Sequence, residues 1–475
     1  MTLLAEVADI QTGPFGSQLH KKDYVASGRP IVTVEHLGKR AFTRQNLPFV
    51  SEFDAERLKK YQMKHGDIIF SRVGSVDRCS YAEKRNEGWL FSGRCLRIRP
   101  KKSIDPEFLY YYLSSKAIKG FVRNIAVGAT MPSINTTLMG EIPIPAISLD
   151  RQRTIACIMS SLDIKLQANA KLNGYLAELA QTIYNDWFRD FGHWGGQMPS
   201  HWETGVLGDY VTVKRGGSPR PIQEYLSDEG LRWLKIADVS GISGPYILEI
   251  KEHIKEEGLR KTVHLEPGSL VLSNSATPGI PKILSIDTCI HDGWLYFPQS
   301  QFTNEWLYCY FLNVRQELVR MANGSVFQNL KTDIVKNFEV IRPDDETLAS
   351  FQEMVAPLFN LMESCQKENK QLAHLRDTLL PKLISGEIDV SKVDLTQLNS
   401  HLAEPDQNLF SFQIHDYGIQ TGFEHNSTRK KARTENGILK EDVECCSPLS
   451  AARNTVDRAN NGWTHWRAVD RLRKS

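Results

Sequence analysis

The sequence lacks the features that would place this chain in a membrane or outside the cell. No apolar run approaches the roughly 20 residues that a membrane-spanning helix needs, and the N-terminus has no charged start followed by an apolar core. The eight cysteines are scattered without a CxxC pair, which argues against a zinc site or a disulfide framework. A reduced, cytoplasmic compartment is therefore expected.

The motifs of common catalytic and nucleotide-binding sites are also missing. We find no Asn-Pro-Pro-Phe/Tyr methyltransferase motif, no GxGxxG fingerprint, no GxxxxGK[ST] loop and no HExxH pair. His36, His65, His264 and His291 are isolated in the sequence from any evident nucleophile or metal ligand. The sequence therefore predicts no catalytic residue, no metal site and no resident cofactor.

What the sequence does contain is an internal repeat. Residues 150–190 recur in degenerate form at 346–386, and a shift of 196 aligns their apolar positions without a gap. The first seam contains Ile155, Met159, Leu162, Leu166, Leu176, Ile183 and Trp187, and the second contains Phe351, Val355, Leu358, Met362, Cys365, Leu372, Leu379 and Leu383. Steps of three and four predict two long helices packed on each other. The alternative is two unrelated amphipathic helices, each covering its own domain. Pro357 predicts a kink or a break in the second helix.

The repeat extends upstream of both predicted helices. Four further pairs of segments match in the same order: Leu4–Val7 with Leu207–Tyr210, Gly66–Ser71 with Gly268–Ser273, Pro106–Leu113 with Asn304–Phe311, and Gly128–Pro145 with Gly324–Ile341. The order is kept while the spacing drifts, as small loop insertions would cause. The pattern predicts an α+β chain with two similar globular domains, each followed by a long helix.

The net charge of +2 conceals an uneven distribution. Residues 1–149 hold 22 Lys and Arg against 14 Asp and Glu, whereas residues 201–343 hold 15 against 17. A basic first domain is a plausible anion-binding surface, and the second would need a local basic patch to bind the same polyanion.

Glycines and small polar residues follow several predicted strands and are flanked by Arg or Lys. Such strand ends suit a surface that follows a nucleic-acid backbone and reaches base edges. In the first domain the candidate DNA-binding residues are Gln11, Ser17, Gln18, Lys21, Lys22, Lys39, Arg40, Arg72, Ser75 and Arg78. In the second they are Lys214, Arg215, Ser218, Arg220, Lys235, Asn274 and Lys282. The alternative for each is an ordinary solvated turn residue.

The ordered motifs resemble those of the specificity (S) subunits of Type I restriction–modification systems. The resemblance covers roughly residues 1–395 and is carried by Gly13-Pro14-Phe15-Gly16-Ser17, Gly66–Ser71, Trp187–Phe191, Met198-Pro199 with Trp202, Leu207-Gly208-Asp209, Gly216-Gly217-Ser218-Pro219 and Leu379–Ile388. Each motif is weak alone, but their order and the duplicated layout are specific together.

The resemblance implies two target-recognition domains, each reading one half of a bipartite, asymmetric double-stranded DNA site. It also implies that the two helices pair as an antiparallel coiled coil between the domains. About 33 helical residues span about 50 Å, enough to hold two domains roughly one turn of B-DNA apart. The expected boundaries are 1–149 and 204–343 for the domains, 150–191 and 344–390 for the helices, and 192–203 for a linker.

The polar seam residues Asn169, Asn173 and Asn369 fall near the middle of the paired helices. Buried asparagines in such a seam fix the register of two helices at a cost in stability. We therefore expect these three residues to set the coiled-coil register.

The resemblance assigns catalysis to partners. It implies two modification (methyltransferase) subunits that use S-adenosylmethionine, joined by restriction/translocase subunits that use ATP and Mg²⁺. A silent or scaffold copy without working DNA specificity is the alternative. A self-contained methyltransferase–endonuclease fusion is disfavoured by the missing motifs. Residues 391–475 extend beyond the resemblance, lack apolar periodicity, and are expected to be disordered.

Overall fold

The computed structural model describes residues 1–239, 241–322 and 329–390, with the side chains of Ser17 and Lys21 outside that description. In the C-terminal extension it describes only four antiparallel strand segments, in the order β25-β24-β23-β26. They are β23 (Gly422–His425), β24 (Lys431–Glu435), β25 (Ile438–Lys440) and β26 (Trp466–Val469). The expected disorder of the extension stays a prediction, because its other residues lie outside the described ones.

The chain forms two compact units, and each contains one end of both long helices. Unit 1 consists of Met1–Gln167 together with the stretch that begins at Gln371, and unit 2 includes Ala168–Lys370. The long helices are α6 (Leu149–Phe188) and α12 (Asp345–Ser385). α12 runs through Pro357 without a break, so of the two expected outcomes only a kink stays a prediction.

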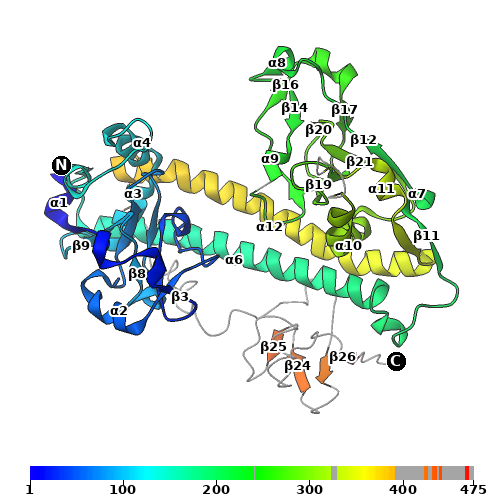
Figure 1. Ribbon diagram of the computed structural model, residues 1–475, viewed down its shortest axis with the longest axis horizontal. Helices are drawn as coiled ribbons and strands as arrows, with labels where there is room; N and C mark the ends of the chain where they lie inside the picture. The colour runs from blue at the N-terminus through cyan, green and yellow to red at the C-terminus, as the bar shows by residue number, and fades with distance from the viewer. Residues whose placement is uncertain are drawn as a thin grey trace. The chain divides into compact units, whose positions relative to one another are not determined.

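Unit 1 is built on two four-stranded sheets (Figure 1). The first has the order β2 (Ala8–Thr12), β9 (Cys95–Pro100), β6 (Ile68–Ser71) and β7 (Cys79–Tyr81). The second has the order β3 (Tyr24–Val25), β5 (Phe49–Val50), β4 (Arg29–Val32) and β8 (Leu90–Phe91). The pair β4–β8 is parallel, and the remaining pairs of both sheets are antiparallel.

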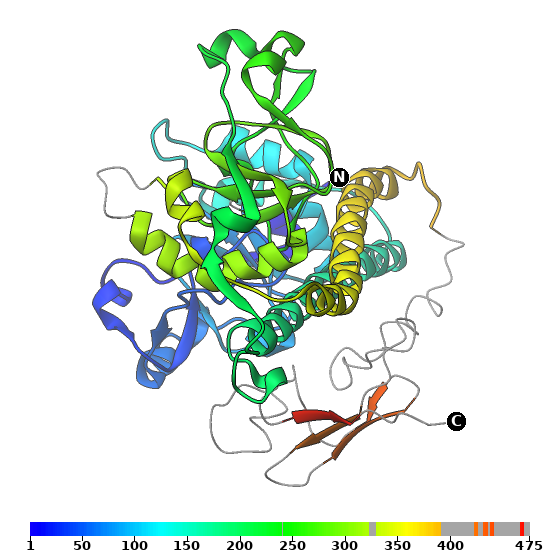
Figure 2. The same cartoon turned by 90° about the vertical axis from the view of Figure 1, so that its right-hand side faces the viewer.

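Unit 2 repeats this topology and adds one strand to each sheet. The first sheet has the order β12 (Val211–Arg215), β21 (Trp294–Ser300), β18 (Leu270–Ser273), β19 (Pro281–Leu284) and β15 (Tyr246–Ile247). The second has the order β13 (Leu226–Ser227), β16 (His253–Ile254), β14 (Leu231–Leu234), β20 (Thr288–Ile290) and β17 (Val263–Leu265). The pair β14–β20 is parallel, as its counterpart in unit 1 is. Within unit 2, the second sheet lies at the end away from α10 and α11 (Figures 1 and 2).

The helices and the closing strand pairs of the units correspond as well. Unit 1 has α1 (Leu4–Val7), α3 (Pro106–Ser114), α4 (Lys116–Ile125), α5 (Thr136–Gly140) and the pair β1 (Thr2–Leu3) with β10 (Pro143–Ile144). Unit 2 has α7 (Leu207–Tyr210), α10 (Asn304–Ala322), α11 (Thr332–Lys336) and the pair β11 (Glu203–Val206) with β22 (Glu339–Arg342). The smaller α2 (Glu52–Arg57), α8 (Ile222–Tyr225) and α9 (Ile236–Val239) complete the described α-helices. The internal repeat is thus a repeat of whole domains.

α6 and α12 run antiparallel within each unit. In unit 1, Arg151 Nη2 donates to Leu383 O at 2.8 Å, and Arg376 Nη1 donates to Asp163 Oδ1 at 3.0 Å. In unit 2, Asn173 Nδ2 approaches Met362 O at 3.4 Å. Partner numbers on α12 fall as numbers on α6 rise, which only opposite helix directions produce. The two seams therefore pack on each other.

A polar joint fastens the sheet side of unit 1 to the helix pair; it comprises Arg40, Glu107, Tyr111, Asp163 and Arg376. Arg40 forms an ion pair with Glu107 and lies 3.4 Å from Tyr111 Oη, which donates to Asp163 Oδ2 at 3.0 Å. Arg376 completes the chain of contacts at the other Asp163 oxygen. The Asp163 side chain is only 8% exposed. Its hydrogen-bond and ion-pair partners offset the free-energy cost of burying its charge.

An aromatic joint fastens the helix pair to the rest of unit 2; it comprises Tyr184, Phe188, Trp306, Tyr308, Phe351 and Phe359. All six side chains are buried. The Phe351 ring lies 5.0 Å from that of Phe188 and 6.2 Å from that of Tyr184, and Tyr308 meets Phe359 edge-on at 5.5 Å. Such T-shaped pairs suit the charge distribution of aromatic rings.

Candidate nucleic-acid interface

A tight turn joins the two sheets at a corresponding place in each unit. Turn 1, Ser92–Arg94, connects β8 to β9, and turn 2, His291–Gly293, connects β20 to β21. Both turns lie beside predicted binding loops, because Arg72 N donates to Arg94 O and Asn274 N to Gly293 O, so they define a corresponding place in the two units.

The same backbone hydrogen bonds hold both turns. Arg72 N donates to Arg94 O at 2.9 Å, and Asn274 N donates to Gly293 O at 2.9 Å. Below them, Cys95 N donates to Ser92 O at 2.9 Å and Trp294 N to His291 O at 3.1 Å. Ser71 and Ser273 also correspond, because each accepts from a backbone N–H seven residues further along. The two loops thus share one frame.

The side chains of Arg72 and Asn274 play corresponding parts in that frame. Arg72 Nη1 points to Gly93 O at 3.4 Å, and Asn274 Nδ2 donates to Asp292 O at 3.1 Å. Both side chains therefore hold a turn in place. Asn274 is only 3% exposed, so it is a positioning residue here rather than the direct DNA contact that its sequence position suggested.

Gly13 and Gly216 occupy corresponding positions in the two predicted loops, and the backbone of a turn passes close to each of them. A Cβ atom at Gly13 would lie 2.2 Å from Ser92 O, and one at Gly216 would lie 2.3 Å from His291 O. Any side chain would push the turn away, so glycine is required by close approach of the backbones.

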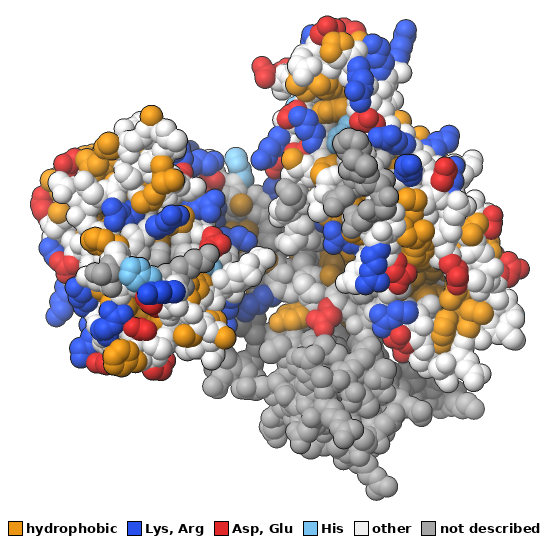
Figure 3. All heavy atoms as spheres, in the orientation of Figure 1, with side chains coloured by type: hydrophobic (Ala, Val, Ile, Leu, Met, Phe, Trp, Pro, Cys, Tyr) orange, Lys and Arg blue, Asp and Glu red, His pale blue; other side chains and the backbone are white. Residues whose placement is uncertain are grey.

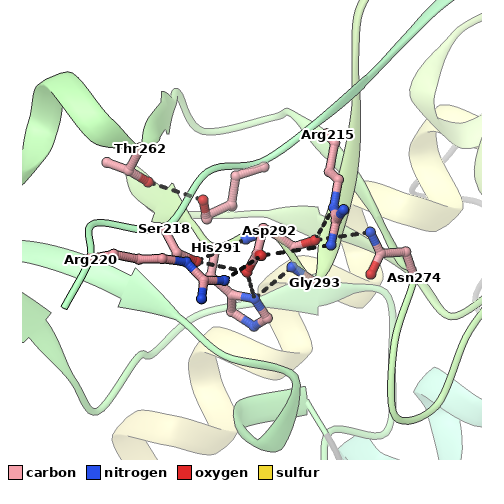
Figure 4. Close-up of polar contacts among 9 residues, drawn as sticks. Arg215, Ser218, Arg220, Thr262, Asn274, His291, Asp292 and Gly293 are labelled. Carbon is pink, nitrogen blue, oxygen red and sulfur yellow. Dashed lines mark hydrogen bonds and ion pairs between the residues drawn. The ribbon is translucent and has the colours of Figure 1, made fainter. Parts of the chain in front are cut away.

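Asp292 is the centre of the polar contacts at turn 2 (Figure 4). Its Oδ1 accepts from Ser218 Oγ at 2.7 Å, and its Oδ2 lies 3.2 Å from Arg220 Nη2 and 3.7 Å from Arg215 Nη2. Burial alone would raise the pKa of Asp292, but the Ser218 hydrogen bond and the arginine charges outweigh it, and the pKa lies below its usual range. The carboxylate is therefore charged at neutral pH.

The predicted residues of unit 1 divide into exposed and internal groups. Lys22, Lys39, Ser75 and Arg78 are exposed, and Gln11 and Arg72 are partly buried. Gln18 accepts a hydrogen bond from Tyr61 at 2.6 Å and so supports the fold. Ser17 and Lys21 carry predictions whose side chains lie outside the described residues.

Arg40 requires a correction. The sequence placed it in the binding loop, but its side chain is 11% exposed and belongs to the polar joint. A guanidinium already paired with a carboxylate inside the protein is not presented to a ligand.

The predicted residues of unit 2 divide in the same way. Lys214, Arg215 and Arg220 are exposed at the loop, and Ser218 bridges to Asp292. Lys235 forms an ion pair with Glu252.

Lys282 also requires a correction. It is 5% exposed, and its ammonium donates to the carbonyls of Ile242, at 3.1 Å, and Gly244. Burial lowers its pKa to about 8. Lys282 therefore supports the 242–244 loop from within and faces no solvent.

Two residues of the turns were missed from the sequence: Arg94, which is exposed, and Asp292. Each lies next to a glycine, shortly after a short apolar strand. That pattern is the sequence signal that could have pointed to these two turn residues. In the view of Figure 3, Lys and Arg side chains appear on both units, interspersed with Asp and Glu.

No group of three or more His, Cys, Asp or Glu side chains in the described part of the chain is placed to hold a metal ion. Among the same residues, no helix combines the length and apolar character needed to cross a membrane.

The duplicated domain and the antiparallel helices define a class of protein. The family model of the Type I restriction modification DNA specificity domain matches residues 2–176 and 199–375, once for each half of the repeat. Because the matched residues make up more than half of the chain, the chain belongs to this family.

Particular relatives agree with this family. The Type I restriction enzyme MjaIX specificity subunit of Methanocaldococcus jannaschii is 26% identical over 317 residues, covering 62% of this chain and 72% of the relative. The HindI specificity subunit of Haemophilus influenzae is 22% identical over 408 residues, covering 69% of this chain and 88% of the relative. The fold resembles that of a Type I S subunit from M. genitalium, with a TM-score of 0.53 and 17% identity over 80% of this chain and 94% of that one.

Proposed function

We propose that this chain is the sequence-specific DNA-recognition subunit of a Type I restriction–modification complex. Each unit would read one half of a bipartite, asymmetric site. The observation that carries the proposal is the shared loop frame of the two units, which holds different side chains in corresponding positions. One backbone frame with two sets of side chains is what reading two different half-sites requires.

The contacts proposed for unit 1 are those of the exposed residues Lys22, Lys39, Ser75, Arg78 and Arg94, together with Gln11. Those proposed for unit 2 are Lys214, Arg215, Ser218 and Arg220. Lysine and arginine at these loops would supply the salt-dependent phosphate contacts, and a good bidentate side-chain contact to a base would discriminate by about 1–3 kcal/mol. Lys235 is also proposed as a DNA contact, which requires its ammonium group to leave Glu252 and bind the DNA instead.

The helix pair is proposed as the spacer between the half-sites, with Asn169, Asn173 and Asn369 fixing its register. α6 has 40 residues and α12 has 41, so each is about 60 Å long at 1.5 Å per residue. Asn169 Nδ2 donates to Asn369 Oδ1 at 3.0 Å and to Glu368 Oε2 at 2.7 Å. A polar contact of this kind supports one axial alignment over its neighbours.

Methylation and cleavage are proposed to belong to partner subunits. Two modification subunits would bring S-adenosylmethionine, and restriction/translocase subunits would bring ATP and Mg²⁺. The specificity-subunit family supports this division of labour, as does the absence of catalytic motifs from the sequence. A cytoplasmic location is proposed because the scattered cysteines suit a reduced compartment.

Genome-wide methylation mapping tests the proposal. The full chain is co-expressed with its modification subunit, and the host is mapped with and without it. A new asymmetric split motif that depends on the chain is expected. A stable complex without a new motif would instead favour a silent or scaffold copy, and methylation by this chain alone would contradict the proposal.

A further inference from the structure

The two turns share a frame but carry opposite charges. At the positions where turn 1 has Gly93 and Arg94, turn 2 has Asp292 and Gly293, as the matched hydrogen bonds of Arg72 and Asn274 show. Turn 1 therefore carries a cationic side chain, whereas turn 2 carries a carboxylate. A carboxylate is an unexpected neighbour for phosphate, so its presence needs a reason.

The carboxylate of Asp292 is not needed to form the turn. Unit 1 builds the same turn with glycine at that position, and in unit 2 the holding contacts go to the Asp292 backbone. Arg215 Nε donates to Asp292 O at 2.5 Å, and Asn274 Nδ2 donates to the same oxygen at 3.1 Å. The role of the Asp292 carboxylate therefore lies in contacts other than those that form the turn.

The Asp292 carboxylate pairs with two cationic side chains of the 214–220 loop. Arg220 and Arg215 both direct a guanidinium nitrogen toward its Oδ2 atom (Figure 4). Both arginines are otherwise open to solvent, with side chains 78% and 52% exposed. Carboxylate and phosphate offer guanidinium groups the same kind of paired oxygens. Asp292 therefore gives these two arginines the kind of partner that a phosphate would give them.

We propose that Asp292 is an internal competitor for the DNA phosphate: it keeps Arg215 and Arg220 convergent in free protein and limits the sequence-independent affinity of unit 2. This inference rests on the DNA-recognition role proposed above and refines it. Because non-specific binding comes almost wholly from phosphate contacts, the carboxylate acts on that contribution directly. Ser218 holds the carboxylate at 2.7 Å, so it remains beside the arginines when they change partner.

The test measures binding of the full chain, in complex with its modification subunit, to a short duplex of unrelated sequence at several salt concentrations. Asp292→Asn is expected to bind about threefold to tenfold more tightly, the range for releasing exposed ion pairs. The slope of log K against log salt should steepen by about 1, one more phosphate neutralised. Asp292→Glu keeps the charge and should stay near the wild type.

Two controls make the result specific. Asp287→Asn makes the same charge change in an exposed ion pair of unit 2, with Arg232 at 2.5 Å, and should leave binding within about twofold. In an Arg215→Ala/Arg220→Ala background, Asp292→Asn should have no effect, because the competitor has lost its targets.

Several outcomes would overturn the inference. They are weaker binding by Asp292→Asn, an equal gain in Asp287→Asn, or a gain that persists without the two arginines. A changed methylation motif would make Asp292 a base-reading residue instead. Failure of the wild-type complex to bind any duplex in a salt-dependent way would contradict the proposed function itself.

Discussion

Units 1 and 2 share a topology but are fastened to the helix pair by different chemistry. Unit 1 uses the polar joint, in which Asp163 on α6 binds Tyr111 and Arg376. At the positions that the repeat equates with Asp163, Tyr111 and Arg376, unit 2 has Phe359, Cys309 and Ala180, and all three are buried. An ionic network in one unit thus corresponds to apolar packing in the other.

The difference shows that the repeat preserves the position of a joint and not its chemistry. Both solutions satisfy the same requirement, because apolar groups pack without partners and buried charges need them. A directional ionic network is also intolerant of an apolar counterpart.

The largest expected effect comes from opening the aromatic joint. Phe351→Ala removes a fully buried ring that contacts Tyr184 and Phe188 and should lower the free energy of unfolding of unit 2 by roughly 3–5 kcal/mol. Urea unfolding followed by tryptophan fluorescence measures it. Met321→Ala, at a side chain of unit 2 that is 52% exposed, is the control and should change it by less than about 0.5 kcal/mol.

Breaking the polar joint should come next. Asp163→Leu leaves Tyr111 without its acceptor and Arg376 with Asp377 as its remaining carboxylate partner, and should destabilise unit 1 by roughly 3 kcal/mol. Asp163→Leu/Arg376→Met makes the joint apolar, as it is in unit 2, and should recover stability to within about 1 kcal/mol of the wild type. No recovery in the double variant would show that the two joint chemistries cannot replace each other.

A smaller, pH-dependent difference should separate the units. Lys282 in unit 2 corresponds to Ser80 in unit 1, and both donate to a loop carbonyl. The pKa of Lys282 is about 8 in the folded chain and about 10.4 when unfolded. Between these values the unfolded state binds more protons, so stability should rise with pH, by up to about 3 kcal/mol.

The measurement is unfolding of unit 2 at a series of alkaline pH values, with Lys282→Met as the comparison. The variant has no ammonium group to neutralise, so the wild-type stability minus the variant stability should rise from pH 8 to 10.5. A flat difference would contradict the account of Lys282.

The smallest expected effect lies in the seam of the helix pair. Asn173 is buried, and its Oδ1 finds no hydrogen-bond partner among the described residues. Asn173→Leu should therefore raise the free energy of unfolding by about 1 kcal/mol. Asn369→Leu should lower it instead, because Asn169 loses an acceptor. A melting temperature lowered by Asn173→Leu would argue against its proposed role.

Much of the fold could be predicted from the sequence. The two seams and the matched upstream segments reveal the duplicated domain, because apolar periodicity is set locally. Gly13 and Gly216 marked loops where the backbone of another segment passes close by, at Ser92 and His291.

The errors at the site have a physical cause. Arg40 and Lys282 are basic residues of the predicted binding surface, yet they face inward, where Glu107 and loop carbonyls satisfy them. Those partners come from other elements, so sequence proximity does not reveal them. Asp292 meets Ser218 from 74 residues away, through strand pairing alone, and this is why the sequence did not associate them.

The most direct test of the central claim is a domain exchange read out by methylation mapping. Residues 1–149 are replaced with the corresponding domain of a relative that recognises a different site, and the chimera is expressed with the modification subunit. The account predicts that one half of the methylated motif changes while the other half is retained. A change in both halves, or in neither, would contradict the proposal that each unit reads its own half-site.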